Sequence, residues 1–233
     1  MPEIVYEDNH LLIAVKQPNQ LTQGDATGDD CLLEELKRYL KEKYHKPGEV
    51  YLGLVHRLDR PVGGLVAFAR TGKAASRLSE QLRSHQMHRD YLLVAENAGT
   101  LPDSGELRHW LLKAGEGEKV RPVPPGTAGA QEAVLHFQTL QRIQDRALVA
   151  VSLETGRKHQ IRVQMAATGH PIVQDMRYGH GVPGKSIALW GAVLTLTHPT
   201  LKTVLRFVSP PRGEAYQPFT REIERYLNPE EKE

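Results

Sequence analysis

The chain has 233 residues, of which 39% are hydrophobic and 25% charged, ordinary values for a globular protein. Its net charge of +2 is too small to indicate a partner, and its single cysteine, Cys31, excludes an intrachain disulfide or a cysteine-rich zinc site. The N-terminal residues lack the basic and apolar regions of a signal peptide, and the longest apolar stretch, Ile187–Leu196, is too short to span a bilayer. We therefore expect a cytoplasmic protein without a membrane partner.

Short apolar runs bounded by turn residues predict most of the chain to be strand. In chain order the predicted strands are Ile4–Tyr6, Leu11–Lys16, Tyr51–Val55, Gly64–Ala69, Tyr91–Ala95, Ala133–Ile143, Ala147–Leu153, Ile187–Thr197 and Thr203–Val208. Two hairpins are expected, one around Gln144-Asp145-Arg146 and one through His198-Pro199. The stretch Gly115–Gly129 is rich in Gly and Pro and predicts a loop.

Helical spacing of apolar residues predicts four helices among these strands. The first carries Leu32 to Leu40 and is capped by Asp29 or Asp30, the second is capped by Thr71, and the others cover Lys158–Thr168 and Phe219–Leu227, before a frayed acidic tail over 228–233. Adjacent pairs of strands favour an α+β fold, a largely antiparallel mixed sheet with flanking helices. No repeat or linker is visible, so a single domain over residues 1–233 is expected.

Three segments carry candidate functional residues. The first is His56-Arg57-Leu58-Asp59-Arg60-Pro61-Val62-Gly63-Gly64, in which the arginines on either side favour the ionised form of Asp59. The second contains Tyr91 at the start of an apolar strand. The third is Glu154-Thr155-Gly156-Arg157-Lys158-His159-Gln160-Ile161-Arg162, a glycine turn that leads into a helix and could bind an anion. Each segment alone is also compatible with an ordinary surface turn, strand or capped helix.

Together the segments resemble the RluA-type pseudouridine synthases. His-Arg-Leu-Asp of that family's signature recurs at His56–Asp59, and its Thr-Gly-Arg-x-His-Gln-Ile-Arg block recurs at Thr155–Arg162. The block that follows in the family recurs at Gly169, Pro171, Ile172, Asp175, Tyr178 and Gly179, and the family's closing His-Pro at His198-Pro199. The resemblance extends from Ile4 to about Pro210, and we expect a stand-alone catalytic domain without an RNA-binding domain of the S4 type.

The resemblance implies the isomerisation of uridine to pseudouridine in structured RNA, either ribosomal or transfer RNA, and the pseudouridine synthase fold. Asp59 would be the essential carboxylate, Tyr91 would stack on the flipped uracil, and Arg162 would pair with Asp59. The RNA would be bound by His56, Arg57 and Arg60 in the first segment and by Arg157, His159 and Gln160 in the third. The family uses neither metal nor cofactor, and a monomer is the simplest expectation. Reaching the base requires flipping it out of the RNA, which costs a few kcal/mol.

The chain departs from the family's usual pattern at several positions. Val62 and Gly63 replace the usual Thr-Ser, Gln164 stands where many members have histidine, and Arg89 replaces a common lysine. None of these departures removes a proposed catalytic group, so they bear on the choice of RNA more than on the chemistry.

Three other functions compete with this interpretation. The segment Gly179–Ser186 matches the P-loop pattern G-x-x-x-x-G-K-[ST], but the residues after it predict a strand rather than a helix, and no aspartate follows Asp175. We therefore expect no nucleotide cofactor. A non-catalytic RNA-binding protein would not need Asp59, Tyr91 and Arg162 together. A glycoside hydrolase normally needs a second carboxylate, and these segments offer none.

Overall fold

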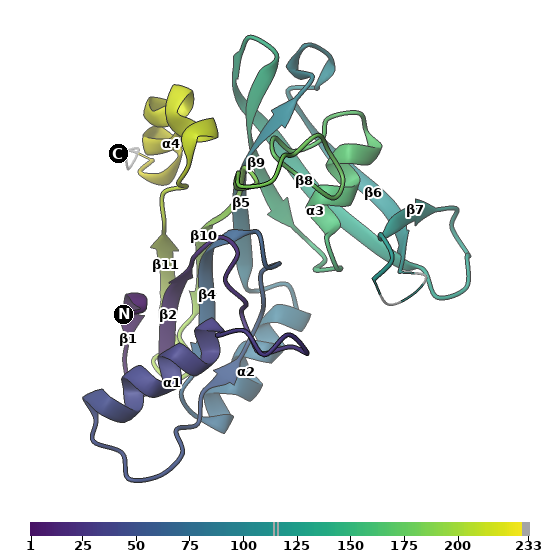
Figure 1. The fold of residues 1–233 in the computed structure, drawn as a ribbon. Helices are drawn as coiled ribbons and strands as arrows, with labels where there is room; N and C mark the ends of the chain where they lie inside the picture. The colour runs from purple at the N-terminus through teal and green to yellow at the C-terminus, as the bar shows by residue number, and fades with distance from the viewer. Residues whose placement is uncertain (114, 116, 230–233) are drawn as a thin grey trace. The chain divides into compact units, whose positions relative to one another are not determined.

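The computed structural model describes residues 1–113, 115 and 117–229, which group into two compact units. Unit 1 comprises Met1–Arg89 and Gly191–Ser209, and unit 2 comprises Asp90–Trp190 and Pro210–Glu233. The chain therefore passes from unit 1 to unit 2, returns to unit 1, and ends in unit 2 (Figure 1). Residues 230–233 of the predicted acidic tail, and residue 116 of the predicted loop, lie outside the described residues. A single domain over residues 1–233 stays a prediction.

Unit 1 is built on a sheet whose central strands are buried. Neighbouring strands follow the order β1 (Glu3–Glu7), β2 (Leu11–Lys16), β4 (Gly63–Ala69) and β10 (Leu189–Thr197), while β3 (Gly53–Leu54) pairs with β4 and β11 (Val204–Val208) pairs with β10. The pairs β1–β2, β2–β4, β3–β4 and β10–β11 are antiparallel. Every residue of β2 and β4 is buried. A strand covered on both faces explains why these two segments are continuously apolar instead of alternating.

Two helices belong to unit 1, and the backbone amides at their N-termini find hydrogen-bond acceptors in different ways. In α2 (Gly72–Arg83) the Thr71 hydroxyl accepts a hydrogen bond from the Ala74 amide at 3.2 Å, as predicted. The predicted acidic cap of α1 (Leu32–Lys43) is wrong, because the N-cap is Cys31 and no side chain caps the helix. The amides of Leu32 and Leu33 instead donate to the carbonyls of residues 21 and 22, at 2.8 and 3.1 Å. Backbone acceptors thus replace the side-chain cap.

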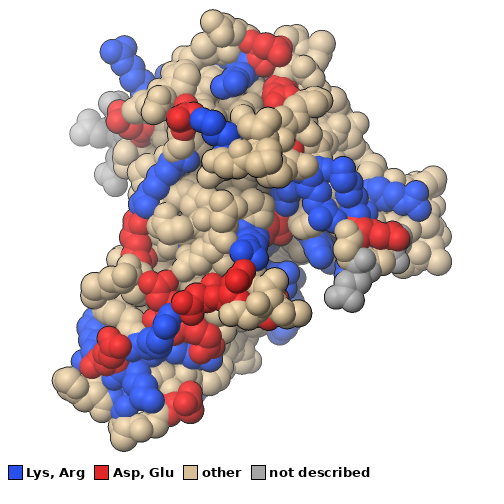
Figure 2. Space-filling model, viewed as in Figure 1, with Lys and Arg blue, Asp and Glu red and all other residues tan. Residues whose placement is uncertain are grey.

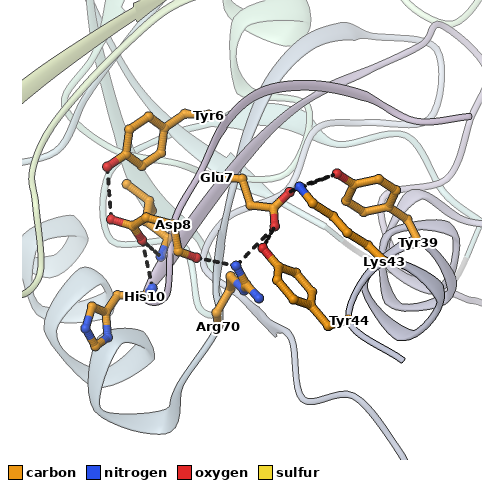
Figure 3. Close-up of polar contacts among 9 residues, drawn as sticks. Tyr6, Glu7, Asp8, His10, Tyr39, Lys43, Tyr44 and Arg70 are labelled. Atoms are coloured by element: carbon orange, nitrogen blue, oxygen red, sulfur yellow. Dashed lines mark hydrogen bonds and ion pairs between the residues drawn. The ribbon is translucent and has the colours of Figure 1, made fainter. Parts of the chain in front are cut away.

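The end of β1 is tied to α1 by polar contacts around Glu7 (Figure 3). The Glu7 carboxylate accepts hydrogen bonds from the hydroxyls of Tyr39 and Tyr44, at 3.0 and 2.6 Å. It also pairs with Lys43 at 2.9 Å and Arg70 at 3.2 Å. Burial alone would raise the pKa of Glu7, but the hydrogen bonds from Tyr44, Lys43 and Tyr39 lower it below its ordinary value. This network closes the part of unit 1 formed by β1 and α1.

Unit 2 contains an antiparallel sheet in the order β5 (His88–Glu96), β9 (Arg146–Leu153), β8 (Gln131–Ile143), β6 (Ser104–Leu112) and β7 (Arg121–Val123). The sequence did not predict β6 or β7, and β7 lies within the predicted Gly115–Gly129 loop. Strand β6 mixes polar and apolar residues and is mostly exposed or half-buried, and it pairs continuously with β8 from Ser104 opposite Gln138 to Leu111 opposite Gln131. Pairing of this kind depends on the partner strand, so it leaves little periodic pattern in the sequence of β6 itself.

The helices of unit 2 are short. Helix α3 (Gln160–Ala167) packs against β6 and β7, and α4 (Thr220–Leu227) follows the 3₁₀ helix η2 (Glu214–Phe219). A second 3₁₀ turn, η1 (Ala98–Thr100), follows β5. The prediction of an α+β fold with largely antiparallel strands is confirmed. Along the described ranges, no helix has both the length and the apolar character needed to cross a membrane.

Candidate active site

Asp59 lies on the loop that connects β3 to β4 in unit 1. The loop closes through a turn in which the Val62 amide donates to the Asp59 carbonyl at 3.0 Å. Gly64 follows with a positive φ of 127°, and a Cβ added there would lie 2.4 Å from the backbone nitrogen of Gly191. Glycine is therefore required at position 64 for two reasons: the positive φ, and the close approach of the Gly191 backbone, which leaves no room for a Cβ.

The backbone on both sides of Asp59 is held by buried side chains. Before it, the Thr22 hydroxyl donates to the Leu58 carbonyl at 3.0 Å and accepts from the Leu58 amide at 3.3 Å. After it, the Lys16 ammonium donates to the Arg60 carbonyl at 3.0 Å. Thr22 is 4% exposed and Lys16 is fully buried, so water does not compete for these bonds. The loop therefore presents Asp59 from a fixed backbone.

Lys16 is the most unusual group of unit 1. Its ammonium also donates to the carbonyls of Gln17 at 3.0 Å and Gln20 at 2.7 Å, so all three of its protons have an acceptor. Burial lowers the pKa of Lys16 to about 7. The charge of Arg60 lowers this pKa further, and the charge of Asp59 partly opposes the shift. Lys16 was not among the predicted site residues. The only signal in the sequence is a lysine at the end of an otherwise apolar strand, two residues before Pro18.

The other predicted residues of this segment differ in burial. Arg57 is exposed and Asp59 is half-buried. Arg60 is exposed and pairs with Asp29 at 2.7 Å, and its Nε donates to the Asn19 carbonyl at 3.2 Å. The ring of His56 is 6% exposed and its Nε2 accepts from the Ala67 amide at 3.1 Å. Burial and the nearby Arg89 charge lower the pKa of His56 to about 3, so the ring is neutral. A contact between His56 and RNA stays a prediction.

In unit 2, the predicted Tyr91 lies on β5. Its side chain is 5% exposed, and the residue stands opposite Val151 of β9 in the antiparallel pair. The sheet fixes its backbone, so Tyr91 is a rigid aromatic group at the start of unit 2.

Gln160 organises the glycine turn at the start of α3. Its amide oxygen accepts from the Thr155 hydroxyl at 2.7 Å and from the Arg157 amide at 2.9 Å. Its amide nitrogen donates to the Val134 carbonyl of β8 at 3.0 Å. Gln160 is 3% exposed, so in the structure it braces the turn that carries the exposed Arg157. The predicted role of Gln160 in binding RNA remains untested.

Arg162 and Asp175 form a buried ion pair in unit 2. Nε of Arg162 lies 2.8 Å from Oδ2 of Asp175, and Nη2 lies 2.7 Å from Oδ1, which is the bidentate geometry that arginine favours. Burial alone would raise the pKa of Asp175. The hydrogen bonds and charge of Arg162, with the amides of Arg177 and Tyr178, lower it below its ordinary value. The expected pairing of Arg162 with Asp59 stays a prediction.

A second contact extends this network. His159 adopts a left-handed backbone with φ of 56°, and its Nδ1 lies 2.8 Å from the Tyr178 hydroxyl, which also accepts from the Val120 amide at 3.1 Å. The Arg162 guanidinium lies 5.3 Å from the centre of the Tyr178 ring. Asp175 and Tyr178 belong to one block of the family resemblance, in which no role was predicted for Asp175. The structure shows that this block anchors Arg162.

The predicted site residues are thus divided between the two units. Unit 1 carries His56, Arg57, Asp59 and Arg60, and unit 2 carries Tyr91, Arg157, His159, Gln160 and Arg162. In unit 2 the segment that matches the P-loop pattern ends at Ser186 and leads into strand β10, so the helix that a P-loop requires does not follow it. Figure 2 shows Lys and Arg side chains gathered on the face of unit 2 that carries α3. Arg157 and Lys158, which precede α3 in the chain, are exposed.

Comparisons with known proteins agree on one family. The family described as RNA pseudouridylate synthase matches residues 10–167. Ribosomal large subunit pseudouridine synthase D of Xylella fastidiosa is 31% identical over 223 residues, covering 89% of this chain and 65% of the relative. The uncharacterized RNA pseudouridine synthase YlyB of Bacillus subtilis is 32% identical over 220 residues, covering 89% of this chain and 68% of the relative. A third, synthase D of Pseudomonas aeruginosa, is 36% identical over 183 residues, covering 76% of this chain and 53% of the relative.

Solved structures show the same fold at lower identity. Human RNA pseudouridylate synthase domain containing 4 matches with a TM-score of 0.74 and 22% identity, covering 97% of this chain and 93% of that chain. Human RNA pseudouridylate synthase domain containing 1 matches with a TM-score of 0.68 and 18% identity, covering 96% of this chain and 95% of that chain. The chain spans 53% to 68% of the length of the three relatives above. The matched profile and the relatives confirm the resemblance seen in the sequence: this chain belongs to the RNA pseudouridylate synthase family.

Proposed function

We propose that this chain isomerises uridine to pseudouridine in structured RNA, with Asp59 as the catalytic carboxylate. The observation that carries the proposal is the loop of Asp59, whose flanking carbonyls are held by Thr22 and Lys16 at 3.0 Å each. A carboxylate that must act on one face of a flipped nucleotide needs a fixed position, since small displacements of a reacting group are costly in rate. A carboxylate that only binds RNA needs no such support and would repel the phosphates.

The roles of the remaining residues follow from the family. We propose that Tyr91 stacks on the flipped uracil, because it is an aromatic group held rigidly by a sheet. We propose that Arg162 provides positive charge for Asp59 while Asp175 fixes its orientation. Arg57, Arg60 and Arg157 are exposed and suit contacts with the RNA backbone.

The names of the relatives suggest the substrate to test first. Two of the relatives above are ribosomal large subunit pseudouridine synthases, so we propose the RNA of the large ribosomal subunit as substrate, with transfer RNA as the alternative. We also propose that the protein is a cytoplasmic monomer and that its reaction needs neither a metal nor a nucleotide cofactor. Size-exclusion chromatography with light scattering on the purified chain tests its oligomeric state.

Pseudouridine mapping of total RNA tests the chemistry. Cells without the protein are complemented with the wild type, with Asp59→Asn, or with Asp30→Asn, a control with the same charge change on the same unit, whose carboxylate is 87% exposed. We expect a modified uridine with the wild type and with Asp30→Asn and none with Asp59→Asn. A modification that persists in Asp59→Asn would move the chemistry to another residue. If no uridine differs in any strain, and the purified chain is also inactive on bulk RNA, a non-catalytic RNA-binding protein becomes the better interpretation.

A further inference from the structure

Unit 2 contains a cavity outside the segments discussed above. Its volume is about 340 Å³, and it is lined by residues 184–188 before β10, residues 212–216 at the start of η2, Val173, Gln174, and Arg146 at the start of β9. This volume is in the range of small-molecule sites. All of these residues belong to unit 2, so the cavity is formed within one compact unit.

The floor of the cavity is apolar and rigid. Val173, Ile187, Ala188 and Tyr216 are each at most 6% exposed. The Ala188 amide donates to the Val173 carbonyl at 2.9 Å, and the Tyr216 hydroxyl donates to the Leu92 carbonyl at 3.0 Å. These bonds hold both sides of the floor to the sheet. The Ala188 amide and the Tyr216 hydroxyl are therefore already hydrogen-bonded within the protein, and the floor presents mainly apolar side chains.

The rim of the cavity is positively charged. Among the described residues that line the cavity, Arg146, Lys185 and Arg212 are exposed cations and Glu214 is an exposed carboxylate. Lys185 pairs with Glu214 at 2.8 Å, but both side chains are more than half exposed, and such a pair is worth at most about 1 kcal/mol. Among the residues that the structure describes, Arg146 makes no ion pair. The Arg212 guanidinium lies 5.6 Å from the ring centre of Trp190, within the range of a cation–π contact.

We propose that this cavity binds a nucleotide phosphate, with the phosphate on the cationic rim and the nucleoside against the apolar floor. Arginine forks and lysine both recognise phosphate, and the lining residues carry three cations and one carboxylate, a balance that suits an anion. No P-loop is involved, since Ser186 leads into a strand. The proposal rests on the proposed function in one respect: RNA bound by the enzyme is the expected source of the nucleotide. Contact with RNA here would position the strand without reading its sequence.

Two variants and a matched control test the cavity. Arg146→Gln and Lys185→Gln each remove one charge from the rim, and Arg221→Gln removes one exposed charge from α4, outside the lining residues. Fluorescence anisotropy measures binding to a labelled stem–loop RNA with uridines in its loop, over a series of salt concentrations. We expect each rim variant to weaken binding about tenfold. Its log–log salt slope should fall by about 0.7 to 0.9, while Arg221→Gln stays near the wild type. Unchanged thermal unfolding excludes misfolding as the cause.

Titration calorimetry with free UMP separates the two sources of nucleotide. If UMP binds the wild type below the millimolar range and fails to bind Arg146→Gln while RNA binding is unchanged, the cavity binds a free nucleotide and RNA is overturned as the source. If both rim variants bind RNA and UMP like the wild type, the phosphate site itself is overturned. Pseudouridine formation at saturating RNA is measured in parallel and should be the same in the control Arg221→Gln and the wild type. A wild-type protein that forms no pseudouridine would refute the proposed function. The binding measurements would still show whether the cavity binds a nucleotide phosphate.

Discussion

Replacing Asp175 with asparagine removes the negative charge of a buried ion pair and keeps the shape of the side chain. The carboxylate is fully buried and the Arg162 side chain is 6% exposed, with 2.7 Å between Oδ1 and Nη2. Loss of one partner leaves the other charge buried without compensation, which costs about 3 to 5 kcal/mol. We expect Asp175→Asn to lower the free energy of unfolding by that amount at pH 7. We also expect pseudouridine formation to fall, because Arg162 loses the group that orients it.

The chain offers a control with the same chemistry at the surface. Arg142 pairs with Asp103 at 2.7 Å, the same distance as the buried pair, but the Asp103 side chain is 89% exposed. An exposed pair contributes at most about 1 kcal/mol, so Asp103→Asn should change stability by less than that. Urea unfolding of the wild type and both variants measures the difference. Equal losses in the two variants would refute the argument that burial sets the value of the Arg162–Asp175 pair.

The dependence on pH gives an independent test of the same pair. The pKa of Asp175 is lowered in the folded state, so its contribution is fully present above the pKa of the unfolded chain, about 3.9 for aspartate. It is lost as pH falls through the lower folded-state pKa. The stability gap between wild type and Asp175→Asn should therefore stay constant from pH 7 to about 5 and narrow below about 4. A gap that begins to close between pH 7 and 6 would contradict a lowered pKa.

Three further substitutions test how the loop of Asp59 is supported. Thr22→Val leaves the Leu58 amide without its buried acceptor, and urea unfolding should show a loss of about 1 to 3 kcal/mol; an unchanged midpoint would contradict this. Gly64→Ala places a Cβ 2.4 Å from the Gly191 backbone at a φ of 127°, so the midpoint temperature of thermal unfolding should fall by several degrees. An unchanged midpoint temperature would show that the two backbones can separate. Because the pKa of Lys16 is lowered to about 7, the unfolded chain binds the extra proton above that pH, and wild-type stability should rise relative to Lys16→Met between pH 7 and 9. A flat difference over that range would show a lysine with an ordinary pKa.

Much of the fold was predictable because its signals are local. The buried strands β2 and β4 are continuous apolar runs, and the hairpins β8–β9 and β10–β11 form at the predicted turns. The hydroxyl of Thr71 caps its helix by accepting from the amide of Ala74, only three positions later in the chain. In each case the physical cause lies within a few residues of its effect, so a single sequence contains it.

The elements that were missed depend on partners distant in the chain. Strands β6 and β7 are specified by pairing with other strands, and the start of α1 is satisfied by carbonyls ten or more residues earlier instead of by an acidic cap. No local pattern distinguishes Cys31 from Asp29 or Asp30 as the cap, because the deciding acceptors are brought there by the fold.

The sequence by itself determined the family, because ordered blocks of residues carry the chemistry: His56–Asp59, Thr155–Arg162 and Gly169–Gly179. Only the tertiary structure decided how those blocks are supported. It showed that Lys16 and Thr22 hold the backbone on either side of Asp59, and that Asp175 pairs with Arg162. The physical reason is that these contacts join residues 13 to 44 positions apart and draw their strength from burial. Burial is a property of the folded chain, and no residue type or spacing expresses it.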